Sequence, residues 1–249
     1  MTECFRRIFD RMADIVWPRT CAVETCARPV DRPHSHICSE CFASLPFYMP
    51  GGACRVCGAP VPAKTPHSFV CEECASNPPP YERVCSALAY DGAAEELIKD
   101  FKYKRAVWLA GDFSELLEGA VRAGLDASSV DSVFPVPLHP NRRRRRGYNQ
   151  SGLLARSLAK RLNRRLDESS LIRTRDTPKQ SLLGGEERRK NLNGAFSVVR
   201  PSFVRGRTVL LVDDVTTTGS TLAAAAEPLR AAGAAHIWCV TLARVTDNL

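Results

Sequence analysis

Eight cysteines in four close pairs constrain the first third of the chain more strongly than any other feature. Three pairs are spaced as CxxC and the first as CxxxxC: Cys21 and Cys26, Cys38 and Cys41, Cys54 and Cys57, and Cys71 and Cys74. A CxxC turn directs two thiolates at one centre, and two such turns complete the tetrahedral thiolate site that zinc prefers. We therefore predict two structural zinc sites, which hold together a segment with few aliphatic residues.

The order of the pairs favours a sequential assignment of ligands. Each half of the set then has two knuckles separated by 11 to 13 residues, although an interleaved pairing is an alternative. Because eight thiolates fill two sites, the spacer histidines are expected to be loop residues: His34, His36 and His67. The remaining cysteines have no partner at a useful spacing and are expected to be core or surface thiols: Cys4, Cys85 and Cys239.

The chain length favours a small module joined to a larger domain. A chain of 249 residues can bury a substantial core. Residues 1–20 carry apolar side chains at helical spacing among acidic ones, which favours a short amphipathic helix over a secretory signal. The run "SNPPPYERV" is typical of a stiff linker. We expect a double zinc ribbon over 21–80 and a second domain over 81–249.

The hydropathy pattern argues against a membrane protein. No apolar run approaches the roughly 20 residues that a membrane-spanning helix needs. We therefore expect no membrane insertion and a cytoplasmic location. In that compartment the 11 cysteines of the chain are poor candidates for disulfides, which agrees with metal binding.

Strand and helix patterns alternate through the second domain. Apolar runs typical of strands occupy residues 84–90, 130–136, 209–212 and 236–243. Helical spacing passes through Leu97, Ile98 and Phe101, and recurs over residues 151–166 and 220–233. Continuous apolar strands that alternate with helices indicate a parallel α/β sheet covered on both faces. Ligands of such sheets bind at the carboxyl ends of the strands.

The stretch "VLLVDDVTTTGST" at 209–221 places two carboxylates at the end of one of these strands. Asp213 and Asp214 repel one another unless a cation or ligand hydroxyls lie against them. The loop that follows enters a helix N-terminus, where free N–H groups bind phosphate, and its hydroxyls add donors. A diol beside a phosphate describes a ribose 5-phosphate. The stretch fits neither a Walker loop nor a dinucleotide-binding loop.

Basic residues concentrate in one part of the chain, whose formal net charge is +8. Residues 137–165 contain ten Lys or Arg and no acidic residue, including the run from Arg142 to Arg146. A solvated basic face is the ordinary interpretation. Five consecutive arginines beside a Pro-containing turn favour a polyanion instead, because a polyanion relieves their mutual repulsion.

The same stretch, 209–221, closely resembles the phosphoribosyl-pyrophosphate motif of type I phosphoribosyltransferases. Nearly the whole chain resembles the ComF family through the cysteine knuckles and the segments "FKYK" at 101–104, "VFPVPLHPNRRRRRGYNQS" at 133–151, "DTPKQSLLGGEERRKNLNGAF" at 176–196 and "LAR" at 242–244. That family joins a double zinc ribbon to a phosphoribosyltransferase-like domain, and some members serve bacterial natural transformation. The CxxxxC spacing of the first pair departs from the family pattern.

The resemblance implies a role for each matching residue. Asp213 and Asp214 would contact the ribose hydroxyls, and the 5-phosphate would lie against Thr216, Thr217, Thr218, Gly219, Ser220 and Thr221. The turn after Pro137, reaching Arg146 and Gly147, resembles a pyrophosphate loop, to which Lys102 and Lys104 would add charge. Gln180, Arg188 and Asn191 would lie in a mobile flap. The catalytic candidates are Asp213, Asp214 and Arg146, together with Mg²⁺ on the pyrophosphate.

Three functions fit these features. The first is a module that binds phosphoribosyl pyrophosphate and also binds single-stranded DNA through Arg142, Arg143, Arg144, Arg145 and Arg146, beside a DNA-uptake helicase or recombination proteins. The second is an active phosphoribosyltransferase that uses an unknown nucleobase or amine acceptor. The third is a zinc-ribbon adaptor with a vestigial site. The sequence contains no identifiable element for reading an acceptor base.

Overall fold

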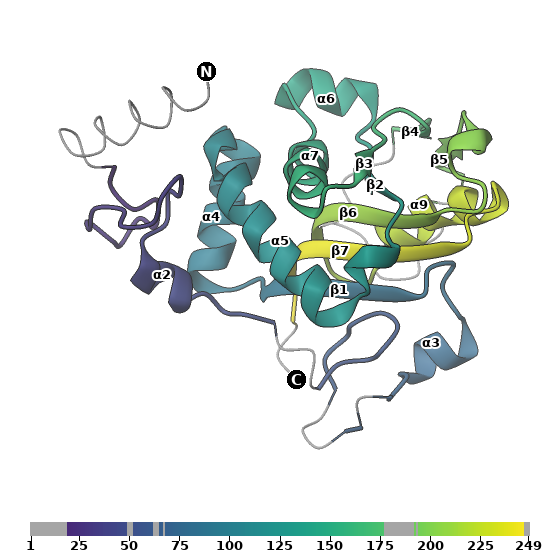
Figure 1. The fold of residues 1–249 in the computed structure, drawn as a ribbon, viewed down its shortest axis with the longest axis horizontal. Helices are drawn as coiled ribbons and strands as arrows, with labels where there is room; N and C mark the ends of the chain where they lie inside the picture. Colours follow the sequence, from purple (N-terminus) through teal and green to yellow (C-terminus); the bar gives the residue numbers. More distant parts are fainter. Residues whose placement is uncertain are drawn as a thin grey trace.

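The computed structural model describes residues 19–48, 52–61, 65–66, 68–176, 192 and 194–246, and Figure 1 shows their arrangement. The N-terminal helix predicted for 1–20 falls outside these ranges except for its last two residues. Cys4 and His67 also lie outside the described residues.

A parallel sheet forms the centre of the second domain, as predicted. Its strands run in the order β1-β7-β6-β2-β3, and all four neighbouring pairs are parallel. The strands are β1 (Arg83–Ala89), β2 (Ser132–Pro135), β3 (Arg165–Leu166), β6 (Thr208–Thr216) and β7 (His236–Arg244). A separate antiparallel pair consists of β4 (Leu171–Arg173) and β5 (Phe196–Val198).

Both faces of the sheet are covered, which explains the continuous apolar strands. Along β6, Leu210 and Val212 belong to one core cluster, whereas Val209 and Leu211 belong to the other. The first cluster lies under α4 (Gly92–Tyr103), α5 (Ala110–Gly124) and α7 (Gln150–Leu162), and the second under α9 (Ser220–Ala231). Short 3₁₀ turns complete the domain: η1 (Val107–Leu109), η2 (Ala127–Ser129) and η4 (Pro201–Phe203).

The arginine run departs from the predicted turn. Residues after Pro137 form a short helix, α6 (Pro140–Arg146), which directly precedes α7 in the chain and lies above it in Figure 1. Pro140 occupies the first turn, His139 accepts the backbone N–H of Asn141, and Gly147 ends the helix at φ +89°. These three signals at the ends stabilise a helix despite the like-charge repulsion among its arginines.

The cysteine-rich segment has little regular structure. Its helices are single turns, α2 (Ser39–Ala43) and α3 (Glu72–Ser76), and each follows a cysteine of a CxxC pair. Within the described part of the chain, no helix is both long and apolar enough to cross a bilayer.

Candidate functional site

Two groups of four cysteines come together as the sequential assignment predicts. Cys21, Cys26, Cys38 and Cys41 form one cage, Cys54, Cys57, Cys71 and Cys74 form the other, and the sulfurs of each cage lie within 4.8 Å of one another. The interleaved alternative is therefore wrong. In the first cage the CxxxxC spacing of Cys21 and Cys26 still places both thiols at the common centre.

The geometry of both cages fits zinc. Four sulfurs about 2.3 Å from a central zinc ion lie about 3.8 Å apart in a tetrahedron. The Sγ atoms of Cys26 and Cys38 are 3.8 Å apart, and so are those of Cys57 and Cys71. Burial opposes ionisation of Cys54, but backbone N–H donors that include that of Cys71 lower the pKa of its thiol to about 7. The cages are two zinc-ribbon sites.

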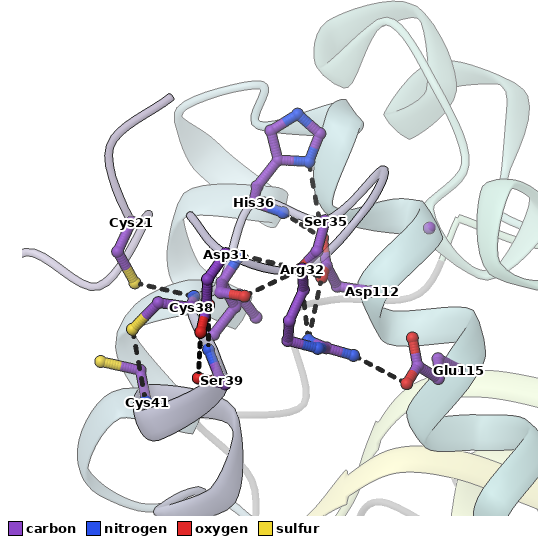
Figure 2. Close-up of polar contacts among 12 residues, drawn as sticks. Cys21, Asp31, Arg32, Ser35, His36, Cys38, Ser39, Cys41, Asp112 and Glu115 are labelled. Atoms are coloured by element: carbon purple, nitrogen blue, oxygen red, sulfur yellow. Dashed lines mark hydrogen bonds and ion pairs between the residues drawn. The ribbon is translucent and has the colours of Figure 1, made fainter. Parts of the chain in front are cut away.

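The first ribbon is bound to α5 through a buried carboxylate, Asp112. Figure 2 shows Arg32, Ser35 and His36 converging on it. Ser35 Oγ donates to Asp112 Oδ1, the backbone N–H of His36 donates to Oδ2 at 3.0 Å, and Arg32 Nη1 lies 3.6 Å from Oδ1. Arg32 also forms an ion pair with Glu115 at 2.7 Å. Sequence patterns give no sign of this contact, because Asp112 lies 76 residues beyond His36.

A cavity of about 150 Å³ lies at the carboxyl ends of β2 and β6. It brings together five of the predicted ligand residues: Lys102, Arg146, Asp213, Asp214 and Thr221. The other lining residues are Tyr103, Val136, Pro137, Leu138, Gln150, Ser151 and Arg173. The predicted flap residues Gln180, Arg188 and Asn191 lie outside the described residues.

The carboxylate pair has partners that the sequence alone does not reveal. Ser151 Oγ donates to Asp213 Oδ1 at 2.7 Å, and Lys102 Nζ lies 3.2 Å from Asp214 Oδ1. Burial, and then the charge of Asp214, raise the pKa of Asp213 to about 7. Lys102 therefore supplies a cation to the pair, whereas Lys104 forms an ion pair with Asp100 instead.

The loop after the aspartates is short and tightly turned. Thr216 is the last residue of β6, and Ser220 is the first residue of α9. Gly219 between them has φ +79°, which a residue with a side chain rarely adopts. The hydroxyls of Thr218 and Ser220 lie 2.7 Å apart, and the backbone N–H of Ser220 points to Thr218 Oγ1. The loop thus gathers hydroxyl and N–H groups at a helix N-terminus, where phosphates bind.

Helix α6 divides the arginine run between two environments. Arg146 lines the cavity, and its guanidinium carbon lies 5.5 Å from the centre of the Tyr103 ring. Arg142 Nε is 3.3 Å from Asp176 Oδ1. Arg143, Arg144 and Arg145 are exposed, and Gly147 does not line the cavity.

Seven lining residues were not among the predicted ligands, and three of them are Gln150, Ser151 and Arg173. Gln150 and Ser151 stand in the first turn of α7, and Arg173 ends β4, 40 residues before Asp213. Arg173 is only 8% exposed, and burial lowers the pKa of its guanidinium. The polar "NQS" stretch after Gly147 is the one local signal that could have identified Gln150 and Ser151.

Comparisons with known families agree with the two-part organisation. Residues 12–75 match the double zinc ribbon domain family, and residues 149–248 match the phosphoribosyl transferase domain family. The DNA utilization protein YhgH of Escherichia coli K12 is 36% identical over 220 residues, which cover 86% of this chain and 94% of that protein. Competence protein F of Haemophilus influenzae is 38% identical over 152 residues, covering 59% of this chain and 66% of that protein.

Similar solved structures are more distant. Phosphoribosylpyrophosphate synthetase from Mycobacterium smegmatis aligns with a TM-score of 0.36 and 21% identity over 54% of this chain, which spans about a third (34%) of that enzyme. A hypoxanthine phosphoribosyltransferase from Staphylococcus aureus aligns with a TM-score of 0.35 and 14% identity, covering 56% of this chain and 67% of that enzyme.

Proposed function

Because the chain belongs to the ComF family, which joins a double zinc ribbon to a phosphoribosyltransferase domain, we propose that it binds phosphoribosyl pyrophosphate with Mg²⁺ and handles single-stranded DNA during DNA uptake. The names of its relatives, a DNA utilization protein and a competence protein, support the DNA-related role. We also propose a cytoplasmic location, where the eight thiols of the two cages stay reduced.

The observation that carries the ligand proposal is the cavity that joins two neighbouring carboxylates to three cationic side chains and to Thr221 at the end of the phosphate-type loop. Asp213 and Asp214 would accept hydrogen bonds from vicinal ribose hydroxyls, and the loop up to Thr221 would receive the 5-phosphate. Arg146 and Lys102 would face the pyrophosphate. The two carboxylates could also hold Mg²⁺, which would neutralise the pyrophosphate oxygens.

Calorimetric titration with phosphoribosyl pyrophosphate and Mg²⁺ tests this proposal. We expect the wild type to bind, and we expect Asp213→Ala plus Asp214→Ala to abolish binding. Asp126→Ala plus Glu168→Ala is a control that also removes two carboxylates, at exposed positions outside the cavity and both cysteine cages. Absence of binding by the wild type would refute the proposal.

Metal analysis should give two zinc ions per chain.

For DNA, the exposed arginines Arg143, Arg144 and Arg145 are the proposed contact to the phosphate backbone. Tyr103, which is 67% exposed beside Arg146, offers a ring on which a base can stack. Arg142 is instead held near Asp176, and Arg146 faces the ligand cavity. We therefore assign the DNA contact to the three central residues of the predicted run, Arg143, Arg144 and Arg145.

Fluorescence anisotropy with a single-stranded oligonucleotide tests the DNA contact. Replacing Arg143, Arg144 and Arg145 with alanine should weaken binding and reduce the slope of log K against log salt by about 2, since each lost phosphate contact contributes about 0.7. The matched control replaces Arg156, Lys160 and Arg161 of α7, which removes the same charge. Equal losses in the two variants would show that only net charge matters.

Transfer to an acceptor is the alternative function within the same site. An active transferase would release pyrophosphate only when a nucleobase or amine acceptor is added. A screen of such acceptors with a pyrophosphate assay distinguishes transfer from ligand binding alone. The variant with Asp213→Ala and Asp214→Ala measures the pyrophosphate that is released without the ligand site.

A further inference from the structure

The two zinc ribbons contact the second domain at different places. The first is bound to α5 through Asp112 and to α4 through the backbone N–H of Glu24, which donates to Glu96 Oε1 at 2.7 Å. None of the residues labelled in Figure 2 lines the ligand cavity. The second contacts the strands that lead to the phosphate loop. This difference suggests that the two metal sites affect the ligand site unequally.

One contact of the second ribbon passes through Arg244, the last residue of β7. Its side chain is only 3% exposed, and Nη1 donates to the carbonyl oxygen of Cys57 at 2.8 Å. Its Nε has no hydrogen-bond partner within the described part of the chain, so the bond to Cys57 matters for a buried cation. Arg244 is also paired in register with Thr216, and the next backbone N–H, of Val245, donates to Thr216 O at 2.9 Å.

Arg244 therefore connects Cys57, a residue of the second cage, to Thr216, at the start of the phosphate loop. The cysteine knuckle is further held by the backbone N–H of Val84 in β1, which donates to Val56 O at 2.8 Å. A shift of this knuckle would leave the Arg244 guanidinium without its acceptor. The end of β7 would then have to move, and Thr216 with it.

A second contact passes through Tyr81, which is 4% exposed and lines a cleft together with Val56 and Cys74 of the second ribbon. Its hydroxyl lies 2.8 Å from the position that a Cβ on Gly219 would occupy. The tyrosine therefore packs directly on the turn of the phosphate loop, where only glycine fits. Movement of the second ribbon would change the support of this turn.

We propose that the second cysteine cage holds the phosphate loop in its ligand-binding shape, with Arg244 and Tyr81 as positioning residues. Loss of metal from this cage lowers ligand affinity, whereas disruption of the first ribbon's contact with α5 does not. This inference rests on the proposed binding of phosphoribosyl pyrophosphate.

Three variants test the role of Arg244. Arg244→Met removes the donor but keeps the volume of the side chain, Arg244→Lys keeps a charged donor, and Asp112→Asn alters the first ribbon's contact. Each is measured by calorimetry with phosphoribosyl pyrophosphate and Mg²⁺, alongside its zinc content. We expect about a 10-fold loss of affinity in Arg244→Met, a partial recovery in Arg244→Lys, and a change below about two-fold in Asp112→Asn. Wild-type affinity in Arg244→Met overturns the inference.

A linkage measurement on the wild type gives a second readout that does not depend on any variant folding. If the second cage stabilises the ligand complex, the ligand must also stabilise metal in that cage. Equilibrium competition for zinc with a coloured chelator should then show one ion held more tightly in the presence of phosphoribosyl pyrophosphate with Mg²⁺ and the other unchanged. No protection, or equal protection of both ions, in a protein that binds the ligand overturns the inference. A wild type that does not bind the ligand refutes the proposed function instead.

Discussion

At the scale of single residues, Asp213 combines burial with a neighbouring like charge. Its pKa is raised to about 7, while an unfolded aspartate titrates near 3.9. Between these values the native state holds one more proton than the unfolded state, so this residue makes stability fall as pH rises. The destabilisation is complete above pH 7 and absent below about pH 4. Asp213 is thus a cost to the fold that the proposed ligand and metal would offset.

Asp213→Asn should therefore raise the melting temperature at pH 8, by about 2–6 °C in buffer without Mg²⁺. At pH 4.5 the difference from the wild type should shrink to about a quarter, because the native carboxyl is then protonated while most unfolded chains still ionise it. Asp126→Asn serves as a control of opposite sign, since hydrogen bonds from Ser128 and Ser129 lower the pKa of Asp126 to about 2. Thermal melts over this pH range check the prediction, and a destabilised Asp213→Asn at pH 8 would contradict it.

The residues of the cavity also show how far sequence reasoning reaches. Asp213, Asp214 and the Thr/Gly loop are contiguous, so a single strand-loop-helix unit places them together. Lys102, Ser151 and Arg173 reach the same cavity from three other elements. Their roles depend on tertiary packing, because two of these elements are helices and the third, β4, lies outside the five-stranded sheet. The sequence predicts Lys102 near the pyrophosphate, and the structure adds its contact with Asp214, which no sequence pattern indicates.

At the scale of elements, the contact of the first ribbon with α5 depends on one buried carboxylate. The side chain of Asp112 is 1% exposed and accepts from the Ser35 hydroxyl and the His36 backbone. Asp112→Ala removes these acceptors and leaves Glu115 as the carboxylate partner of Arg32. We expect a loss of about 2–3 kcal/mol in the free energy of unfolding, measured by urea titration. Glu115→Ala, at a side chain 42% exposed, should change it by less than about 1 kcal/mol.

Helix α6 illustrates why one element was predicted incorrectly. Five like charges in a row argue against a helix when only side-chain repulsion is considered. The ends of the segment decide otherwise, because Pro140 and Gly147 are well suited to the start and the stop of a helix. Asp176, 34 residues later, then offsets part of the charge at Arg142. The long apolar strands, in contrast, were predicted correctly. A strand buried on both faces has a continuous run of apolar residues, and such a run is visible in the sequence.

At the scale of the whole molecule, the proposed ligand and DNA sites share α6. Arg146 faces the cavity, and the three arginines before it face solvent. Arg143 lies only one helical turn before Arg146 on this seven-residue helix, so two polyanions bound at the exposed arginines and in the cavity lie close together and repel one another. Their binding should therefore be negatively coupled, and the coupling must be reciprocal.

We expect saturating phosphoribosyl pyrophosphate with Mg²⁺ to weaken single-stranded DNA binding by about two- to five-fold at low salt. The effect should fade at 0.5 M salt, where screening shortens the range of the repulsion to a few ångströms. Anisotropy titrations with and without the ligand measure it, and calorimetry with and without DNA should return the same factor. In the variant that lacks Arg143, Arg144 and Arg145, the residual DNA binding should no longer respond to the ligand. Stronger DNA binding in the presence of the ligand would contradict an electrostatic coupling and would indicate that the ligand orders the DNA-binding surface instead.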